Sequence, residues 1–350
     1  MGDPAATRRP LRWGVASLIE EPMPEVTRQS ARLEELGFTD IWVPDERLLR
    51  NVYVALAMIA TATQHVGIGT AVTNPYTRHP AHTAAAIATI DELSGGRATL
   101  ALGAGGGLDA YGIQRRNPVG VLREAITLIR ALLTGEKTSY EGDFFTLKDT
   151  QIDFPVQRAV PIYLAARGPK ILELAGEIAD GAIIGGFASE PGIRYAKEAI
   201  ARGAARAGRD PSQVETMAWL YVSAADDPRA ARVAVSKMVL ASLITSRPIL
   251  DRIGLEIPAS LRDHLDSTGW RYPTETPEEA SALLPDHIVD AFAIHGTDDE
   301  CRAQLSELME LGIDQLSFVL FPAAGDDKAG LAERIATKIV TPLRQRASER

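Results

Sequence analysis

The sequence predicts a closed (β/α)8 barrel, in which parallel strands alternate with helices around one core. Eight short runs rich in Val, Ile and Leu recur along the 350 residues, and they lack the polar alternation of a strand with one wet face. Helix-period segments separate these runs, and the order continues to the end without a break in composition. The strand candidates are residues 11–18, 38–44, 66–72, 98–104, 161–166, 181–186, 217–224 and 315–321.

The helices between the strands carry ordinary start and stop signals. Several begin with proline near the first turn, and Gly37, Gly95 and Gly135 follow the ends of three of them. An open doubly wound sheet is the alternative, because it differs from the barrel mainly in strand number and closure. Since the order of elements is unbroken, we expect one domain over residues 1–350. The clearest helix candidates are residues 23–36, 80–93, 118–133 and 169–179.

Two segments interrupt the repeating pattern. Residues 138–147 predict a hairpin that turns at Glu141 and Gly142. Residues 228–290 are helical in pattern, are punctuated by prolines, and follow the seventh strand as an insertion. On a barrel this insertion lies after the carboxyl end of a strand, so it is either a lid over the site or an element for oligomer packing.

Composition excludes several classes of function. The chain has 37 basic and 46 acidic residues and a net charge of -9, which argues against a nucleic-acid partner because phosphate binding needs clustered Lys and Arg. Cys301 is the only cysteine, so the chain can form neither an intrachain disulfide nor a thiolate metal cluster. We expect Cys301 to be structural.

No stretch of the chain predicts a membrane span. No run approaches the roughly 18 consecutive apolar residues that a transmembrane helix needs. Residues 1–10 contain two arginines without an apolar core after them, unlike a secretory signal. We therefore expect a cytoplasmic protein without a membrane partner.

The residues most suggestive of chemistry follow the third strand. Asn74, Arg78 and His79 stand with two prolines where that strand gives way to a helix, and in strand–helix repeats this edge carries the active site. His79, just before Pro80, is a candidate hydrogen-bond donor to a ring carbonyl. His82 lies one helical turn further on, and we expect it to be packed or solvated. Zinc would need more ligands than these, so no metal is expected.

The second strand exits through two carboxylates, Asp45 and Glu46. We expect Asp45 to cap a helix, because aspartate accepts hydrogen bonds from the free N–H groups of a first turn. Glu46 either faces the pocket as a catalytic group or lies on the surface, and the sequence leaves both open.

Two further strand ends predict contact with a flat, phosphorylated ligand. Glycines at 103 and 105–107 permit positive φ and a close approach of a ring, although Leu108 breaks the dinucleotide fingerprint. After the fifth strand, Gly168 and Pro169 leave free N–H groups at a helix start, flanked by Arg167 and Lys170. These features indicate a phosphate cradle, with a plain strand–helix junction as the alternative.

Taken together, these motifs resemble the luciferase-like monooxygenase superfamily over most of the chain. The likeness is strongest to its coenzyme F420-dependent branch, typified by methylenetetrahydromethanopterin reductase. Several long matches occur in the expected order, which makes them more specific than any single one. The matching segments are residues 37–43, 50–53, 73–80, 91–97 and 165–170.

The resemblance implies a TIM barrel with the cofactor at the carboxyl ends of the strands. It implies a cis peptide between Ala71 and Val72 that backs the deazaflavin ring, with Asn74 and His79 holding that ring. It also places the cofactor phosphate at residues 167–170. The remaining cofactor-binding candidates are Gly105, Gly106, Ala166, Arg167, Gly168, Pro169, Lys170, Gly185 and Gly186.

Three positions depart from the reductase pattern. An Asp-His pair is expected where Asp45 and Glu46 stand. Acidic residues are expected near Ala16 and Ser17 and at Gly106. These changes lie on the substrate side, so we do not assign the pterin substrate.

The expected function is hydride transfer between F420 and a carbonyl, imine or activated alkene, with Glu46 as the candidate proton donor and His79 as the second catalytic candidate. An FMN-dependent monooxygenase or reductase of the same fold is one alternative. A non-catalytic cofactor-binding relative is the other, and the missing acidic residues motivate it. The expected partners are a small-molecule substrate and a second copy of the chain in a homodimer.

Overall fold

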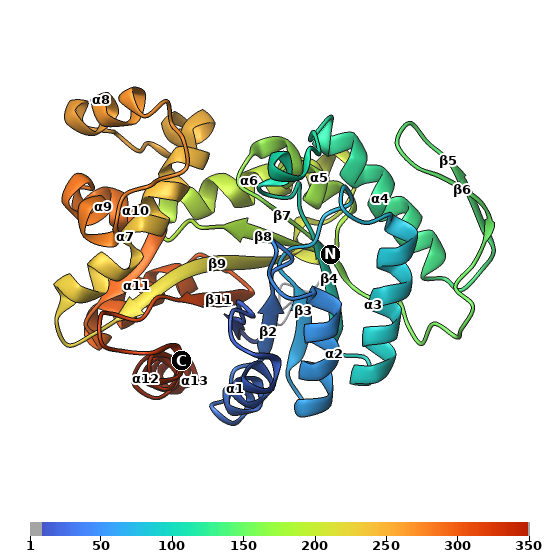
Figure 1. Cartoon of the computed structure of the whole chain (residues 1–350), viewed down its shortest axis with the longest axis horizontal. Coiled ribbons are helices and arrows are strands. Elements are labelled where there is room, and N and C mark those ends of the chain that lie inside the picture. The colour runs from blue at the N-terminus through green and yellow to red at the C-terminus, as the bar shows by residue number, and fades with distance from the viewer. Residues whose placement is uncertain (1–8, 349–350) are drawn as a thin grey trace, which may run out of the picture.

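The structure, a computed structural model, describes residues 9–348 and confirms the closed barrel (Figure 1). All eight predicted strands are present and parallel, and β8–β9 and β1–β11 pairings close the sheet. This closure rules out the open-sheet alternative. The barrel strands are β1 (Arg12–Ala16), β2 (Asp40–Val43), β3 (Gly67–Thr70), β4 (Ala98–Leu102), β7 (Ile162–Ala166), β8 (Gly181–Gly185), β9 (Glu215–Ala224) and β11 (Gln315–Leu320).

The outer helices begin where the prolines predicted. All four predicted helices are confirmed, each with proline in its first two positions, which suits the fixed φ of that residue. The helices around the barrel are α1 (Met23–Glu35), α2 (Val52–Ala62), α3 (Pro80–Ser94), α4 (Pro118–Leu132), α5 (Pro169–Ile178), α6 (Glu190–Arg206), α11 (Asp298–Glu310), α12 (Lys328–Arg334), the π-helical η4 (Ile335–Val340) and α13 (Thr341–Ser348), and the short 3-10 turns are η1 (Leu108–Tyr111) and η2 (Pro211–Gln213).

A polar network closes the amino end of the barrel. Arg12 donates to Asp40 at 2.8 Å and also pairs with Glu215. The Tyr163 hydroxyl donates to Glu215 at 2.6 Å, and burial together with this carboxylate raises the pKa of Tyr163, so the phenol keeps its proton. The buried interior cluster lies next to this network. Such a plug holds the strands together and leaves the chemistry to the opposite end.

The predicted hairpin is confirmed as β5 (Thr138–Glu141) and β6 (Thr146–Thr150), packed beside α4 at the edge of Figure 1. The turn between the strands begins at Gly142 as expected. The Glu124 carboxylate of α4 accepts hydrogen bonds from the backbone N–H groups of three turn residues, which fixes the hairpin to the barrel.

The insertion is helical as predicted and forms a lobe beside the barrel (Figure 1). The sequence missed the strand β10 (Ala293–Gly296), which pairs with the carboxyl half of β9. This strand is four residues long and follows a helix directly, so no turn signal announces it. The other elements of the lobe are α7 (Pro228–Thr245), the 3-10 segment η3 (Arg247–Ile253), α8 (Ala259–Ser267), α9 (Pro277–Leu283) and α10 (Asp286–Phe292).

Cys301 is fully buried, and burial raises the pKa of its thiol to about 12, which fits the structural role expected of it. Among residues 9–348, no single helix is long and apolar enough to cross a membrane. One pair of segments has the length and composition of a membrane span when the two are taken together, but the pair is bent by 93°. These segments are Pro228–Thr245 and Arg247–Ile253.

Candidate active site

Small residues gather at the carboxyl end of the barrel interior, a region called the cup here. The interior cluster below it consists of Trp42, Ala101, Tyr163, Ile183 and Met217, and Ala71, Val72 and Ala165 pack against this cluster. The Ala71–Val72 peptide is cis, as the resemblance implied. A Cβ on Gly103 would stand 2.7 Å from the Val72 side chain, so glycine is required where β4 passes this peptide.

Asn74 is buried and organises the turn after β3. Its Oδ1 accepts hydrogen bonds from the backbone N–H groups of Tyr76 and Thr77, both at 3.0 Å. This local bonding explains why an asparagine folds the segment in this way. Because the carbonyl oxygen is used by the turn, the amide nitrogen is the group of Asn74 that could donate to a ring.

His79 caps helix α3 instead of standing free. Its Nδ1 accepts from the Ala81 N–H at 3.2 Å, and its ring meets Phe145 edge-on at 5.5 Å. Burial, with a further contribution from His82, lowers the pKa of His79. The neutral ring therefore carries its proton on Nε2, and the role of His79 as a donor to a ring carbonyl stays a prediction. Within the described residues, no group of three His, Cys, Asp or Glu side chains could hold a metal ion.

The expectation that Asp45 caps a helix is wrong. Asn51 caps α2, accepting from the N–H groups of Tyr53 and Val54. Asp45 instead accepts from the Thr73 hydroxyl at 2.7 Å and lies 3.8 Å from the Arg78 guanidinium. The helix begins seven residues after Asp45, so its carboxylate is free to tie the end of β2 to the end of β3.

Glu46 lies at the surface of the β2–α2 connection. Its side chain is 49% exposed, and its carboxylate stands 3.4 Å from the Arg47 guanidinium. No hydrogen bond links it to Asn74 or His79. The proton-donor role of Glu46 therefore stays a prediction.

The glycine loop after β4 folds onto the Asn74 turn. Gly105 has φ +71, and a Cβ there would lie 3.3 Å from the Asn74 side chain, while Gly106 faces open space. Arg115 donates to the Gly105 carbonyl at 3.1 Å, and the Tyr76 hydroxyl donates to the Arg116 carbonyl at 3.2 Å. The loop thus forms one wall of the cup.

Arg167 is bound by the protein itself. Its Nε donates to the Gly185 carbonyl at 2.8 Å, and Nη2 donates to the Tyr221 hydroxyl at 3.2 Å and the Ser242 hydroxyl at 3.1 Å. Nη1 contacts the Thr245 hydroxyl and the Ser242 carbonyl. These five contacts use the N–H groups of the guanidinium. Arg167 therefore contributes positive charge, but its donors hold β8, β9 and α7 together.

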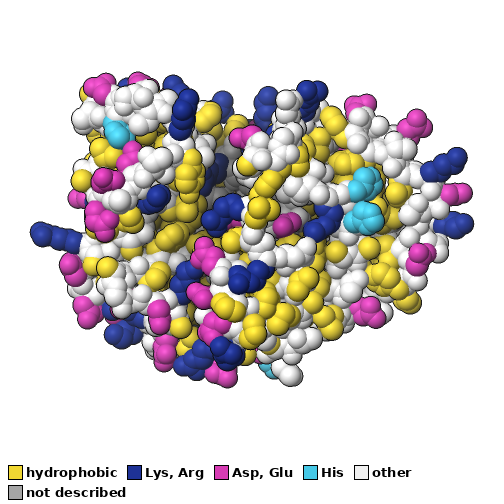
Figure 2. All heavy atoms as spheres, in the orientation of Figure 1, with side chains coloured by type: hydrophobic (Ala, Val, Ile, Leu, Met, Phe, Trp, Pro, Cys, Tyr) yellow, Lys and Arg dark blue, Asp and Glu magenta, His cyan; other side chains and the backbone are white. Residues whose placement is uncertain are grey.

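The start of α5 opens into a hollow of about 370 Å³ between the barrel and the insertion. Gly168 precedes the helix without a side-chain cap, so the first N–H groups are free, as predicted. Lys170 lines the hollow from α5 and Arg252 lines it from η3, and neither has an ion pair with a described residue. Figure 2 shows this face hollowed between the insertion and the barrel helices, with Lys and Arg side chains at the rim. Sequence reasoning missed Arg252, which no motif marks.

An aromatic wall completes the cup on the β9 side. Trp219 pairs in register with Gly185, and its carbonyl accepts from the Gly186 N–H at 2.9 Å. Further along, the Tyr221 and Phe321 rings meet edge-on at 5.7 Å. The predicted glycines 185 and 186 thus stand beside a tryptophan that no sequence motif marks.

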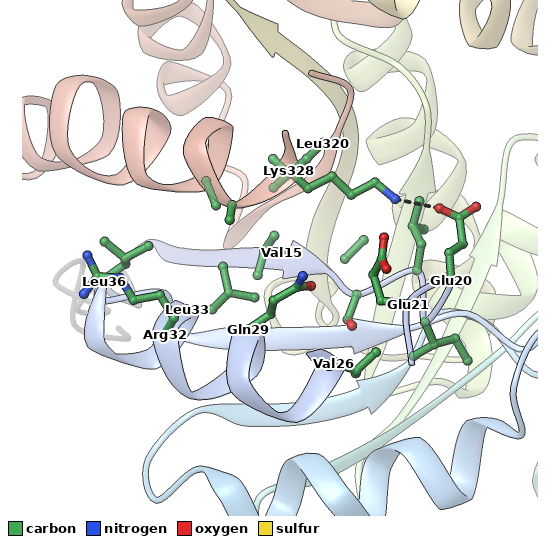
Figure 3. A pocket seen from close by; sticks show the side chains of 16 residues that line it. Val15, Glu20, Glu21, Val26, Gln29, Arg32, Leu33, Leu36, Leu320 and Lys328 are labelled. Carbon is green, nitrogen blue, oxygen red and sulfur yellow. Dashed lines mark hydrogen bonds and ion pairs between the residues drawn. The ribbon is translucent and has the colours of Figure 1, made fainter. Parts of the chain in front are cut away.

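A second hollow lies outside the barrel wall, between α1 and α12 (Figure 3). Its lining is mostly apolar, and Lys328 bridges to Glu20 at 2.6 Å across one end. It contains none of the predicted site residues. We read it as an imperfect helix–helix junction.

The chain is thus a closed barrel protein whose candidate site combines apolar residues at the carboxyl ends of eight parallel strands with a cationic hollow at a helix start. These two features suit a flat ligand with an anionic tail. The profile of the luciferase-like monooxygenases matches residues 7–315, and the chain belongs to this family.

Individual relatives agree with this assignment. The chain is 36% identical over 311 residues to 5,10-methylenetetrahydromethanopterin reductase of Methanolobus tindarius, covering 87% of this chain and 93% of the relative. It is 35% identical to the enzyme of the same name from Archaeoglobus fulgidus, over 95% of this chain and all of the relative. The solved coenzyme F420-dependent tetrahydromethanopterin reductase of Methanopyrus kandleri shares the fold with a TM-score of 0.81 at 24% identity, over 95% of this chain and 99% of that one.

Proposed function

We propose that the protein is an F420-dependent oxidoreductase acting on a small organic substrate. The observation that carries the proposal is the pairing of an apolar cup with an adjacent hollow that presents Lys170, Arg252 and the free N–H groups of α5. The relatives named above, and an F420-dependent glucose-6-phosphate dehydrogenase of Intrasporangium calvum at 26% identity over 91% of this chain and 95% of the relative, support the choice of cofactor.

The residues present fit both the deazaflavin ring and the phosphate of this cofactor. Ala71 and Val72 would lie behind the ring, Asn74 and His79 would donate to its polar edge, and the glycines at 105, 106, 185 and 186 would let it approach the backbone closely. The α5 N–H groups beyond Pro169 would hold the phosphate with Lys170. When bound, F420 supplies a hydride. The protein's part is to bind, orient and exclude water.

A binding titration tests the cofactor. The purified protein is titrated with F420 and, separately, with FMN, and fluorescence quenching is followed. The proposal predicts tight binding of F420 and at least about tenfold weaker binding of FMN, a difference of about 1.4 kcal/mol. A preference for FMN would assign the protein to flavin chemistry instead. If the protein binds neither cofactor, the proposed phosphate-binding site at the start of α5 is contradicted.

Glu46 is the candidate proton donor. Glu46→Gln removes the acidic proton and keeps the shape, so turnover should fall by about a hundredfold while the Kd for F420 stays the same. Glu35→Gln, on the exposed face of α1, is the matched control. Full activity in Glu46→Gln would remove Glu46 from the mechanism.

The non-catalytic alternative has one specific observation in its favour. Ala16, Ser17 and Gly106 stand where the reductase pattern has acidic residues. A protein that binds F420 but reduces no carbonyl, imine or activated alkene in a screen would meet this description. Turnover of any of these electrophiles would exclude it.

We also infer that two copies associate through the outer face of α2 and α3. Helix α2 carries no charged residue, and Val54 is 55% exposed on it, whereas α1 and α6 carry ion pairs on their outer surfaces. The uncharged surface of α2 can meet its own copy across a two-fold axis without repulsion. Light scattering should give a dimer, and Val54→Asp should give a monomer with unchanged F420 affinity. A wild-type monomer would contradict this inference.

A further inference from the structure

The strand β9 places one large side chain inside the cup. The residues of β9 that face the barrel interior alternate along the strand. Met217 belongs to the buried interior cluster, and Trp219, two residues nearer the carboxyl end, packs on that cluster from above. Met217 is fully buried, whereas Trp219 is partly exposed. The indole therefore presents its free surface at the mouth of the barrel.

The neighbouring strands β8 and β11 fix the backbone around this indole. The N–H of Gly186 donates to the carbonyl of Trp219 at 2.9 Å, and Gly185 is its register partner on β8. On the other side, Ser317 of β11 is the register partner, and its hydroxyl is held against the Met217 sulfur at 3.0 Å. Both register partners of Trp219 are small, and part of its side chain stays exposed.

The side chains that follow Trp219 at inward positions of β9 and β11 carry no charge. They are Tyr221, Val319 and Phe321. The Arg167 guanidinium lies beside this wall, but its donors are engaged by Gly185, Tyr221 and Ser242. A carboxylate placed against this wall would lose its hydration without gaining a free donor, which is unfavourable.

We propose that Trp219 is a specificity-determining residue against which the substrate lies, and that the substrate is an uncharged carbonyl compound or activated alkene with a flat apolar face. This inference rests on the proposed function, because it places the substrate in the part of the cup that the bound cofactor would not fill. An indole offers a large rigid apolar surface, so it favours flat molecules over polyols and phosphates.

The experiment compares two probes of the same ring size on the F420-loaded protein, with calorimetry as the readout. Cyclohexenone is the uncharged probe and cyclohexene carboxylate the charged one. The wild type should bind the enone at least about tenfold more tightly than the carboxylate. Trp219→Ala should weaken enone binding about tenfold, which corresponds to the loss of one stacked aromatic surface. Trp219→Phe should restore binding to within a few-fold of the wild type.

The Kd for F420, measured on each variant, separates the possible failures. We expect it to change by less than about threefold, which also shows that the variants are folded. Tighter binding of the carboxylate, or unchanged enone binding in Trp219→Ala, would overturn the inference while leaving the proposed function intact. A large loss of F420 affinity with unchanged enone binding would assign Trp219 to the cofactor instead. If the wild type binds no F420, both proposals fall.

Discussion

The guanidinium of Arg167 donates to the phenol oxygen of Tyr221 at 3.2 Å. Arg167 directly follows β7 and Tyr221 lies on β9, with β8 between the two strands in the sheet. The same guanidinium reaches Ser242 and Thr245 on α7, the first helix of the insertion. One side chain thus fixes the insertion to the barrel mouth, next to the helix start that would receive the cofactor phosphate. The insertion is therefore a wall of the candidate site.

Arg167→Met should loosen the insertion. The change removes the charged donors and leaves the Tyr221 and Ser242 hydroxyls without their partner, at a cost of about 2–4 kcal/mol in the free energy of unfolding. Urea denaturation measures this cost, and limited proteolysis should cut the insertion faster. Arg202→Met, which loses only a surface ion pair with Glu173, should cost less than about 1 kcal/mol. Equal effects of the two changes would contradict the anchoring role.

Arg252→Gln should weaken F420 binding by about five- to twentyfold, because it removes an unpaired cation from the anion hollow. Binding of the corresponding deazaflavin without the phosphate should not change, and the loss for F420 should shrink as salt rises. Arg262→Gln, on α8 outside the hollow, is the control. Equal weakening of both deazaflavins would show that Arg252 acts on the fold or the ring instead.

Gly203→Ala should strongly destabilise the protein. A Cβ at this position would stand 1.8 Å from the Glu173 carbonyl oxygen, where α6 crosses α5. Backbone cannot yield as a side chain does, so we expect a loss of about 3 kcal/mol. Because α5 carries the phosphate cradle, F420 affinity should fall as well. Ala205→Gly, exposed on the same helix, should cost only about 1 kcal/mol by helix propensity. A melting temperature unchanged in Gly203→Ala would contradict the close helix contact.

His79 should titrate below the ordinary value of 6.5, since burial and His82 lower its pKa. Protonation would also break the Nδ1 contact with the Ala81 N–H and place a cation at a helix start. A histidine with a lowered pKa binds protons more readily in the unfolded chain. Its neutral ring therefore stabilises the fold above about pH 6.5, and this contribution is lost as the pH falls toward the folded pKa.

Histidine NMR resonances followed against pH test this expectation, with the urea-unfolded chain as the reference. The His79 midpoint should lie below that of the unfolded chain. In His79→Asn, which keeps a capping group, stability between pH 5 and 7 should depend less on pH than in the wild type. A His79 midpoint above the unfolded value would contradict the capped, neutral ring.

The sequence was sufficient to predict the barrel and to select the edge at which the candidate site lies. Parallel strands buried on both faces read as continuous apolar runs, and proline and glycine mark helix ends locally, so strands and helices could be placed from neighbouring residues alone. The turn at Asn74 and the uncapped start of α5 are local for the same reason. The cis Ala71–Val72 peptide followed from family resemblance.

Only the tertiary structure decided how the groups at this edge are used. A strand covered on both faces has no polar alternation, so the sequence could not tell that Trp219 faces the cup. Arg167 finds its partners 18 to 78 residues away, and Arg252 reaches the hollow from an insertion without a motif. The sequence suggested a cap at Asp45 because the helix start could not be placed to the residue. The partner of Asp45 in the structure is Thr73, which follows the next strand. Contacts between distant segments depend on strand order and register, which local patterns do not encode.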